Sequence, residues 1–407
     1  MRRRRLRVVV EWTRPGGVSE RSERASGGRG HDHRLEWTRP GGVSERVVLD
    51  KRALNRATLQ RQLLLERSGI GVVAAVEQLV GLNAQAPNDP YLALASRLSR
   101  FEPAELTAAI ENRSLVRAPM MRATQHLVLA ADYRWLRPVL QPLLARVQRN
   151  VFGRRTKDVD LTELVADARR IMAGTVRPRP ELGRLLAADR PGADSEALAW
   201  SVQYLLPVVH PAPSGTWDTL GTIPLVLAEE HLGGALDAPN PRRMVRRYLA
   251  AFGPATVTDI RAWSGVSGLK EVLAEMRHEL RTFRDESGRE LVDLPDAPHP
   301  DPETPVPVRL LAPFDNLLLG YADRTRLMTD EVRRRGCVGD LVASTLLIDG
   351  MVSGIWELDR AAGVVTVRPF VRLVRPDVDA VVAEGARVPK LAAAGVARPD
   401  VRVLRPT

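Results

Sequence analysis

The sequence predicts an α+β protein in which three helices and a β-hairpin recur three times ahead of a β-rich C-terminal region. The clearest set spans residues 241–294, where helix, helix, turn, helix and hairpin follow in the order of a winged-helix motif. Two earlier stretches repeat this order with only faint sequence similarity, and residues 308–407 contain runs typical of strands. We therefore expect three tandem winged-helix motifs plus a C-terminal β-rich region.

Length and composition are those of a globular protein. The 407 residues allow two or three domains, and 44% hydrophobic with 27% charged residues is ordinary for proteins with buried cores. Cys337 is the only cysteine in the sequence, which excludes an internal disulfide framework and a multi-thiolate zinc site. Histidines and carboxylates do not cluster at metal-ligand spacing, and we expect no metal and no cofactor. No apolar run approaches the roughly 20 residues of a membrane helix. We expect a cytoplasmic, nucleoid-associated monomer.

Charge is unevenly placed along the chain. Residues 1–46 contain 12 arginines and 6 acidic residues, and thus carry +6 of the total net charge of +11. The undecapeptide EWTRPGGVSER occurs twice, at Glu11–Arg21 and Glu36–Arg46, and offers too little apolar surface to stack as a folded repeat. We expect a disordered basic extension there, or alternatively a basic arm that contacts phosphates. The remaining +5 is consistent with binding of a polyanion.

The first winged-helix region is expected over residues 47–150. Its elements are predicted as helices at 54–68, 76–86, 89–98 and 103–112, a two-stranded wing at 114–130 and a helix at 132–151. Pro87 disfavours helical backbone at Ala86 and is expected to end the second helix. Pro103 suits the first turn of the fourth helix, where its missing N–H costs nothing.

The later regions are predicted from shorter signals. The second region, 151–238, is expected to contain a helix at 182–186, a helix from an N-cap at Ser195 to 206, and a hairpin turning at 213–215. The third motif, 239–296, is expected to contain helices at 241–251, 257–263 and 267–280, with Ser267 as the last N-cap, and strands around 285–288. After a Pro-rich linker at 295–307, the C-terminal region is expected to contain a hairpin around an apolar strand at 314–324, a hairpin turn at 349–350 and a helix near 377–384.

Two carboxamides, Asn83 and Gln85, flank Ala84 shortly before Pro87. Residues two apart diverge by about 200° on a regular helix, so they cannot converge there. If Pro87 makes the last turn irregular, both side chains are able to enter one cavity. The alternative is that they only satisfy carbonyl groups at the C-terminus of a helix.

Other polar residues are candidates for ligand contact, each with a structural alternative. His126 either orients a phosphate or a base, or is a structural histidine after a strand. Three arginines on one predicted helix either contact backbone phosphate or form a solvated face; they are Arg243, Arg246 and Arg247. Four residues around the LLLGYA segment either form a ligand loop or a solvated hairpin edge; they are Asp315, Asn316, Asp323 and Arg324. P-loop, dinucleotide-binding and GxSxG motifs are absent from the sequence.

Four segments together resemble a known family: VGLNAQAPNDPYLALASRL, LVRAPMMRATQHLVLAADY, RRYLAAFGPATVTDIRAWSG and LLAPFDNLLLGYADRTRLM. In order, over about residues 48–370, they are similar to the bacterial winged-helix DNA-binding family of AlkZ-like DNA glycosylases. Characterised members remove alkylated purines and unhook interstrand crosslinks that bridge purine N7 atoms. The resemblance implies a monofunctional DNA glycosylase that acts on double-stranded DNA without a cofactor.

The resemblance also implies the site residues. The family's catalytic motif, Gln-x-Gln or Gln-x-Asp, falls on Asn83-Ala84-Gln85, which implies that Gln85 and Asn83 are catalytic. Asn83 is one methylene shorter than the family's Gln, so Asn83→Gln is expected to leave activity equal or raise it. The family's DNA-holding hairpin maps onto Phe314–Arg324. The residues implied for DNA contact are Arg122, His126, Arg243, Arg246, Arg247, Asp315, Asn316, Tyr321 and Arg324.

The chemistry of such a reaction suits carboxamides. A carboxamide does not titrate near neutral pH, but it accepts from and donates to a water and so holds that water for attack. An N7-alkylated purine is cationic and leaves readily, so the enzyme mainly supplies positioning and electrostatic complementarity. The alternative function is a non-catalytic winged-helix DNA-binding protein or regulator, in which Asn83 marks lost catalysis.

Overall fold

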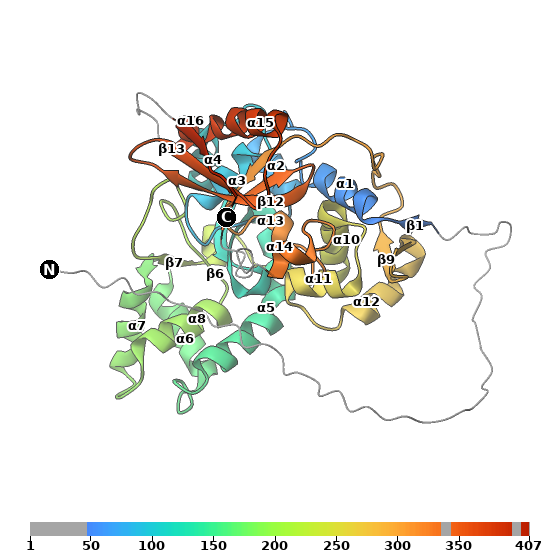
Figure 1. The fold of residues 1–407 in the computed structure, drawn as a ribbon. Helices are drawn as coiled ribbons and strands as arrows, with labels where there is room; N and C mark the ends of the chain where they lie inside the picture. The colour runs from blue at the N-terminus through green and yellow to red at the C-terminus, as the bar shows by residue number, and fades with distance from the viewer. Residues whose placement is uncertain (1–46, 335–342, 393–399, 407) are drawn as a thin grey trace, which may run out of the picture. The chain divides into compact units, whose positions relative to one another are not determined.

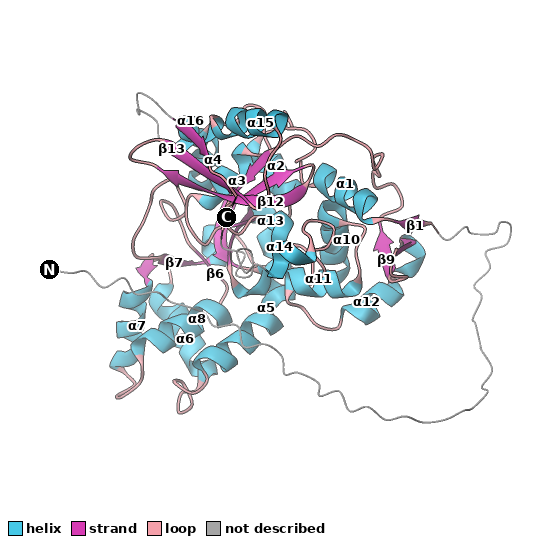
Figure 2. Cartoon of the chain, viewed as in Figure 1, coloured by secondary structure: helices cyan, strands magenta, loops and turns pink. Residues whose placement is uncertain are grey.

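One order of elements, namely helix, strand, helix, helix, strand and strand, recurs three times along the chain. The computed structural model describes residues 47–334, 343–392 and 400–406, and the expectations for residues 1–46 lie outside them. The first set comprises α2 (Val72–Gln78), β2 (Leu82–Asn83), α3 (Asp89–Ala95), α4 (Pro103–Glu111), β3 (Leu115–Pro119) and β4 (Gln125–Leu129). A 3₁₀ turn, η1 (Met121–Ala123), lies between β3 and β4. Helices and strands thus alternate in small groups, which makes the protein a mixed α and β structure (Figure 2).

The second and third sets follow the same order. The second comprises α6 (Leu161–Met172), β5 (Arg177–Pro178), α7 (Arg179–Ala188), α8 (Ser195–Leu205), β6 (Val208–Val209) and β7 (Pro224–Leu227). The third comprises α10 (Pro241–Phe252), α11 (Val257–Ser264), α12 (Leu269–Glu275), β8 (Arg281–Asp285) and β9 (Glu290–Asp293), with a 3₁₀ turn, η2 (Arg277–Glu279), before β8. A single bridge from Ala255 to Val292 takes the place of its first strand.

The three small sheets share one strand order. The last strand lies between the other two in the sheets β2-β4-β3 and β5-β7-β6. In the third sheet β9 lies between the Ala255 bridge and β8, and β1 (Val48–Leu49) adds to the far side of β8 in parallel. Because sheet order and helix order both repeat, the three sets are structural repeats even though their sequences differ.

Long helices connect these sets. α5 (Ala130–Phe152) follows β4 directly and continues through Pro138 and Pro142 as one helix, which packs against α8. α1 (Lys51–Arg61) packs on α10 of the third set, and the short α9 (Ala228–His231) follows β7. Figure 1 shows α5 passing from the first set toward the helices of the second.

The C-terminal region contains the largest sheet of the described chain. Its five strands, in chain and spatial order, are β10 (Arg309–Leu311), β11 (Thr345–Ile348), β12 (Met351–Asp359), β13 (Val364–Pro369) and β14 (Asp400–Val403). Neighbouring strands are antiparallel except β13 and β14, which are parallel. α15 (Arg375–Gly385) covers one side of this sheet and α16 (Arg387–Ala392) follows it (Figure 1). Two short helices, α13 (Asn316–Leu319) and α14 (Asp330–Arg334), lie between β10 and β11. The predicted hairpin turn is confirmed at Asp349–Gly350, which both have positive φ.

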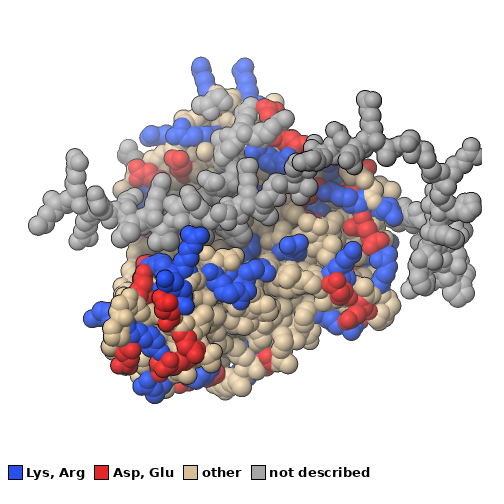
Figure 3. Space-filling model, turned by 90° about the horizontal axis from the view of Figure 1, so that it is seen from below, with Lys and Arg blue, Asp and Glu red and all other residues tan. Residues whose placement is uncertain are grey.

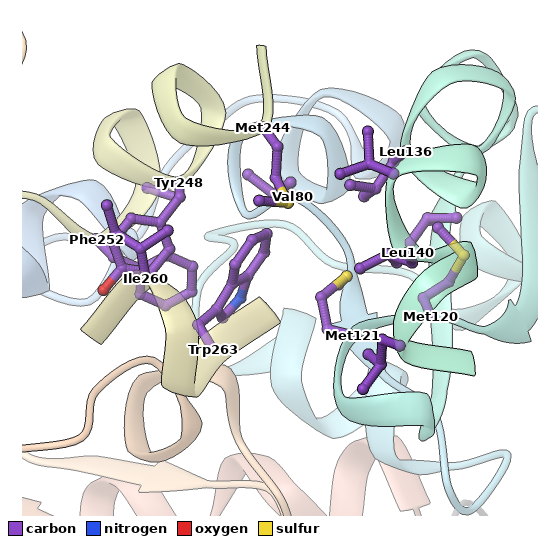
Figure 4. Close-up of a cluster of buried hydrophobic side chains, with 14 of the residues drawn as sticks. Val80, Met120, Met121, Leu136, Leu140, Met244, Tyr248, Phe252, Ile260 and Trp263 are labelled. Atoms are coloured by element: carbon purple, nitrogen blue, oxygen red, sulfur yellow. The ribbon is translucent and has the colours of Figure 1, made fainter. Parts of the chain in front are cut away.

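One hydrophobic core joins the first and third sets. Figure 4 shows Tyr248 and Trp263 of the third set and Met121 of η1 in this core, with Val80 between the sets. Trp263 is 3% exposed and its ring lies 5.2 Å from that of Tyr248. Burial of large apolar side chains at this junction stabilises each by about 1.5–3 kcal/mol, which holds η1 and the start of β4 against α11.

The predicted helix at 76–86 is wrong in its second half. α2 ends at Gln78, and Val80 and Gly81 have positive φ of 56° and 94°. A Cβ atom on Gly81 would lie 2.6 Å from a methyl of Val128, so the chain passes too close to β4 for a helix to continue. The next residues extend as β2, and Asn83 therefore lies on a strand.

Other local expectations also need correction. The 314–324 segment forms α13 and turns instead of a hairpin around a strand, because the side chain of Asp315 caps the N–H of Leu317. The strands β6 and β7 are separated by residues 210–223, so they do not form the predicted tight hairpin at 213–215. The N-caps fall one residue away from the predicted serines, at Asp194 and Gly268. α1 ends at Arg61 rather than near residue 68.

Candidate functional site

Asn83 lies at the end of β2, where the edge of the first small sheet meets the C-terminal region. It pairs across the ladder with His126 of β4, and only 5% of its surface is exposed. Its backbone N–H donates to Oδ1 of Asn316 at 3.3 Å, and Nδ2 of Asn316 donates to the carbonyl of Gly81. The predicted residues Asn83, His126 and Asn316 are therefore brought together, although they lie far apart in sequence.

The two carboxamides of the motif close a small turn. Oδ1 of Asn83 accepts the backbone N–H of Gln85 at 3.1 Å, and Oε1 of Gln85 accepts the backbone N–H of Gln125 at 2.9 Å. Gln85 is exposed, whereas Asn83 is buried. Within the described residues, Nδ2 of Asn83 and Nε2 of Gln85 donate no hydrogen bond, and each carboxamide oxygen keeps a lone pair. The turn thus retains polar groups that are able to bind a water.

Two buried charged residues bind consecutive backbone groups of this turn. Nε and Nη2 of Arg117 donate to the carbonyl of Ala84 at 3.0 and 2.8 Å, and Nη2 also reaches the carbonyl of Gln85 at 3.3 Å. Oδ2 of Asp89 accepts the N–H of Ala86 at 3.1 Å. Because Arg117 is 4% exposed and Asp89 5% exposed, both groups are well shielded from water. The backbone of the motif is consequently fixed by two buried side chains.

Burial shifts the pKa of both groups. It raises the pKa of Asp89 to about 6, against the opposing effects of the Ala86 hydrogen bond and the charge of Arg117. Burial also lowers the pKa of Arg117 to about 10, while Asp89 acts in the other direction. Neither residue is among the sequence-predicted site residues. Asp89 is the first residue of α3, and an acidic residue in the first turn of a helix is the sequence signal that could have pointed to it.

His126 and Arg122 form a second polar group beside Asn83. Nδ1 of His126 donates to the carbonyl of Thr124 at 2.9 Å, so Nε2 accepts from Nη2 of Arg122 at 3.4 Å. Nη1 of Arg122 donates to the carbonyl of Trp263 at 2.6 Å. Burial first, and then the charge of Arg122, lower the pKa of His126 to about 3, so this histidine is neutral at physiological pH.

The remaining predicted residues of the C-terminal region differ in exposure. Asp315 is completely buried and forms an ion pair with Arg97, with N···O distances of 2.6 and 2.8 Å. Tyr321 is 1% exposed, and its hydroxyl donates to the carbonyl of Phe252. Arg324 is half-buried, and its Nε is buried without a hydrogen-bond partner. Of these three, Arg324 alone presents part of its side chain to solvent.

The three predicted arginines among the four of α10 are engaged in ion pairs. Arg247 donates to both oxygens of Asp132 at 2.8 and 3.1 Å, and Arg246 pairs with Glu279. Arg243 stacks over the ring of Trp135 at 4.5 Å. Figure 3 shows that basic and acidic side chains also stand together at both sides of the face seen from below. Compensation by carboxylates therefore reduces the free positive charge of α10.

Within residues 47–334, 343–392 and 400–406, no group of three or more His, Cys, Asp or Glu residues is placed to hold a metal ion. No helix in the same part of the chain combines the length and the apolar character that crossing a bilayer requires.

Comparisons with known proteins identify the family of this chain. The family model of AlkZ-like DNA glycosylases matches residues 76–391. The solved structure of the Streptomyces sahachiroi DNA glycosylase AlkZ is similar with a TM-score of 0.73 and 24% sequence identity, over 88% of this chain and 100% of that chain. No curated protein matches the chain. Because the family model covers most of the chain, including the Asn83–Gln85 turn, this protein belongs to the AlkZ-like DNA glycosylase family.

Proposed function

We propose that this protein hydrolyses the N-glycosidic bond of N7-alkylated, cationic purines in double-stranded DNA. Unhooking of interstrand crosslinks through purine N7 is proposed as a second reaction of the same site. The observation that carries the proposal is the turn Asn83-Ala84-Gln85, which lies within the residues that the family model matches and is held by Arg117 and Asp89. The family resemblance implies that the catalytic motif falls on this turn. A turn with a fixed backbone is suited to positioning a water.

The reaction needs little from the protein beyond this positioning. Water attacks C1′, the bond between C1′ and N9 breaks, and its electron pair neutralises the positive charge of the purine. One proton of the water passes to solvent. The carboxamides of Asn83 and Gln85 are neutral hydrogen-bonding groups, so they orient the water and do not act as strong bases. A leaving group that is already cationic matches a site with this chemistry.

We further propose that the three structural repeats are winged-helix motifs and that the protein binds duplex DNA as a monomer. The shared order of helices and the central position of the last strand in each sheet support this. Arg324 is proposed to contact DNA. Asp315, Asn316 and Tyr321 would support that surface from below, since all three side chains are buried. The predicted arginines of α10 already pair with carboxylates; they are Arg243, Arg246 and Arg247. Each would contact a phosphate either by giving up its carboxylate or through N–H groups that the carboxylate does not use.

A non-catalytic DNA-binding protein is the second candidate function. One observation favours it: one acceptor site on each carboxamide oxygen is already used within the protein, by Gln85 N–H and by Gln125 N–H. In that case the turn would be a structural connection between β2 and α3, and DNA would bind without loss of a base.

Incubation of the purified full chain with duplex DNA that contains a single N7-methylguanine separates the two functions. We expect release of free N7-methylguanine and an abasic site at that position, detected by chromatography and by alkaline cleavage. The modified duplex incubated without protein is the control for spontaneous loss, and a duplex with unmodified guanine is the control for specificity. Tight binding of both duplexes without base release would support the second candidate and contradict the first.

A further inference from the structure

Two arginines, Arg122 beside His126 and Arg324 after α13, have no carboxylate partner within the described residues. Arg122 contacts only the Trp263 carbonyl and the neutral ring of His126. Arg324 makes no side-chain hydrogen bond there, and its Nε is buried. The nearest carboxylate in sequence, Asp323, is already paired with Arg289 at 2.5 Å. Arg97 and Arg247 differ in this respect, since both pair with acidic side chains.

Both arginines adjoin α11: the Trp263 carbonyl near the end of this helix accepts from Arg122, and one turn earlier Oδ1 of Asp259 accepts the N–H groups of Ala322 and Asp323, directly before Arg324. Burial lowers the pKa of Arg122 to about 10, and the charge of Arg324 contributes to this shift. Burial is also the main cause of a lowered pKa at Arg324. Partly buried cations without an anion are costly, because neither water nor a carboxylate replaces the lost hydration. A pair of this kind is stabilised when an external anion binds between its members.

The backbone holds Arg122 for such a ligand at a further cost. Arg122 and the following Ala123 have positive φ of 55° and 59°, and neither is glycine. Non-glycine residues in this region cost on the order of 1–3 kcal/mol each, and they persist where the surrounding structure fixes them. Here the Trp263 carbonyl and Nε2 of His126 each take one N–H of Arg122, which leaves three of its five N–H donors for a ligand.

We infer that Arg122 and Arg324 together bind one phosphodiester group of the DNA backbone, beside the damaged nucleotide. The position follows from the sheet: His126, which orients Arg122, pairs directly with Asn83 of the candidate catalytic turn. A phosphate held there would fix the strand that carries the lesion relative to Asn83 and Gln85. Arginine suits this task because its planar fork of donors matches two phosphate oxygens. This inference rests on DNA being the ligand, as proposed above.

A double-mutant cycle between protein and DNA tests the inference. Arg324→Ala is combined with duplexes in which a methylphosphonate removes the charge of one phosphate at a time around the N7-methylguanine. Dissociation constants are measured by fluorescence anisotropy with the full chain. Arg155→Ala is the matched control, since Arg155 is an arginine with 40% of its side chain exposed and already paired with Asp194 and Glu196. Arg122→Gln serves as a second variant, and melting temperatures verify that each variant folds.

We expect Arg324→Ala to weaken binding by about tenfold and to lower the slope of log K against log salt by about 0.9, the contribution of one phosphate contact. When the methylphosphonate replaces the phosphate that Arg324 contacts, Arg324→Ala should not weaken binding any further. Arg155→Ala should not couple to any position. The inference would be overturned if Arg324→Ala weakened binding by the same factor whichever phosphate is replaced. It would also be overturned if Arg324→Ala bound the duplex as tightly as the wild type.

The readout is binding, so the outcome is independent of base release. Coupling at one phosphate without release of N7-methylguanine would support the phosphate site and contradict the proposed glycosylase activity. Base release without coupling would overturn the phosphate site alone. Absence of DNA binding by the wild type would overturn both.

Discussion

The side-chain oxygen of Gln85 accepts the backbone N–H of Gln125 at 2.9 Å. This bond ties an exposed side chain to the first residue of β4, and so to the strand that carries His126. It leaves Nε2 of Gln85 and one lone pair of Oε1 for a water. Gln85 is therefore held in one orientation without being buried, as expected for a group that positions a reactant.

Asn83 is predicted to act through the turn it closes. Asn83→Ala removes the acceptor for the Gln85 N–H, and we expect base release to slow by roughly tenfold to a hundredfold. Asn83→Asp keeps an acceptor at the same reach and should retain most of the rate. Single-turnover release of N7-methylguanine measures both variants.

The structure also reverses the sequence-based expectation for Asn83→Gln. Asn83 is 5% exposed, and its oxygen is at the right reach to accept from Gln85 N–H, so a longer side chain would disturb the turn. We therefore expect Asn83→Gln to lower the rate. A rate equal to or above that of the wild type would show that the turn is not required.

Asp89 makes base release dependent on pH. Its pKa is raised to about 6, so the carboxylate that holds Ala86 N–H and balances Arg117 becomes protonated below that pH. We expect the single-turnover rate to fall as pH decreases from 7.5 to 5. In Asp89→Asn the rate should be lower at pH 7.5 and nearly constant over this range. An unaltered pH profile in Asp89→Asn would exclude Asp89 as the titrating group.

Two buried histidines are predicted to destabilise the fold in acid. Burial lowers the pKa of both His126 and His210 to about 3, whereas the unfolded value is about 6.5. The unfolded state therefore binds more protons below pH 6.5, and stability decreases as pH falls from there toward 3. Each histidine should cost about 2 kcal/mol at pH 5 relative to pH 8.

Asp89 opposes this trend, because its raised pKa lets the folded state bind a proton between about pH 6 and 3.8. Urea unfolding at pH 8 and pH 5 measures the net change. In His210→Gln the loss between the two pH values should be about 2 kcal/mol smaller than in the wild type. An equal loss in both proteins would contradict a buried neutral His210.

Asp315 is predicted to support the fold rather than to touch DNA. Removal of one partner from a fully buried ion pair typically costs about 3–5 kcal/mol, because the other charge remains buried. Asp315→Ala should therefore lower the free energy of unfolding by about this amount, because Arg97 would stay buried without its partner. Asp330→Ala, at an exposed pair with Arg333, should change it by less than about 0.5 kcal/mol. Normal stability with weakened DNA binding in Asp315→Ala would favour direct contact instead.

Elements with local signals could be predicted from the sequence. α11 begins with a capping box between Thr256 and Asp259 and ends at Gly265, which has a φ of 78°, so both of its ends are readable. β2 was not predictable in this way. It is two residues long, and it forms because Leu82 pairs with Leu127, 45 positions further along the chain. A strand fixed by a distant partner has no local periodicity to detect.

The same distinction applies to the candidate site. Asn83, Gln85, Arg122 and His126 could be named from the family resemblance, since each lies in a segment that carries it. Arg117 holds the turn through backbone carbonyls, which any sequence possesses, so no motif reveals it. The spatial relation between His126 and Asn83 likewise depends on the sheet register and not on the spacing of the residues.

The central claim is that Gln85 positions the water that releases a cationic purine. The most direct test compares the single-turnover rate of N7-methylguanine release by the wild type and by Gln85→Ala, with the dissociation constant for the same duplex measured alongside. The account predicts a rate that is slower by about a hundredfold or more in Gln85→Ala, at an unchanged dissociation constant, because only stabilisation of the transition state is lost. Base release by Gln85→Ala at the wild-type rate, or no release by the wild type, would contradict it.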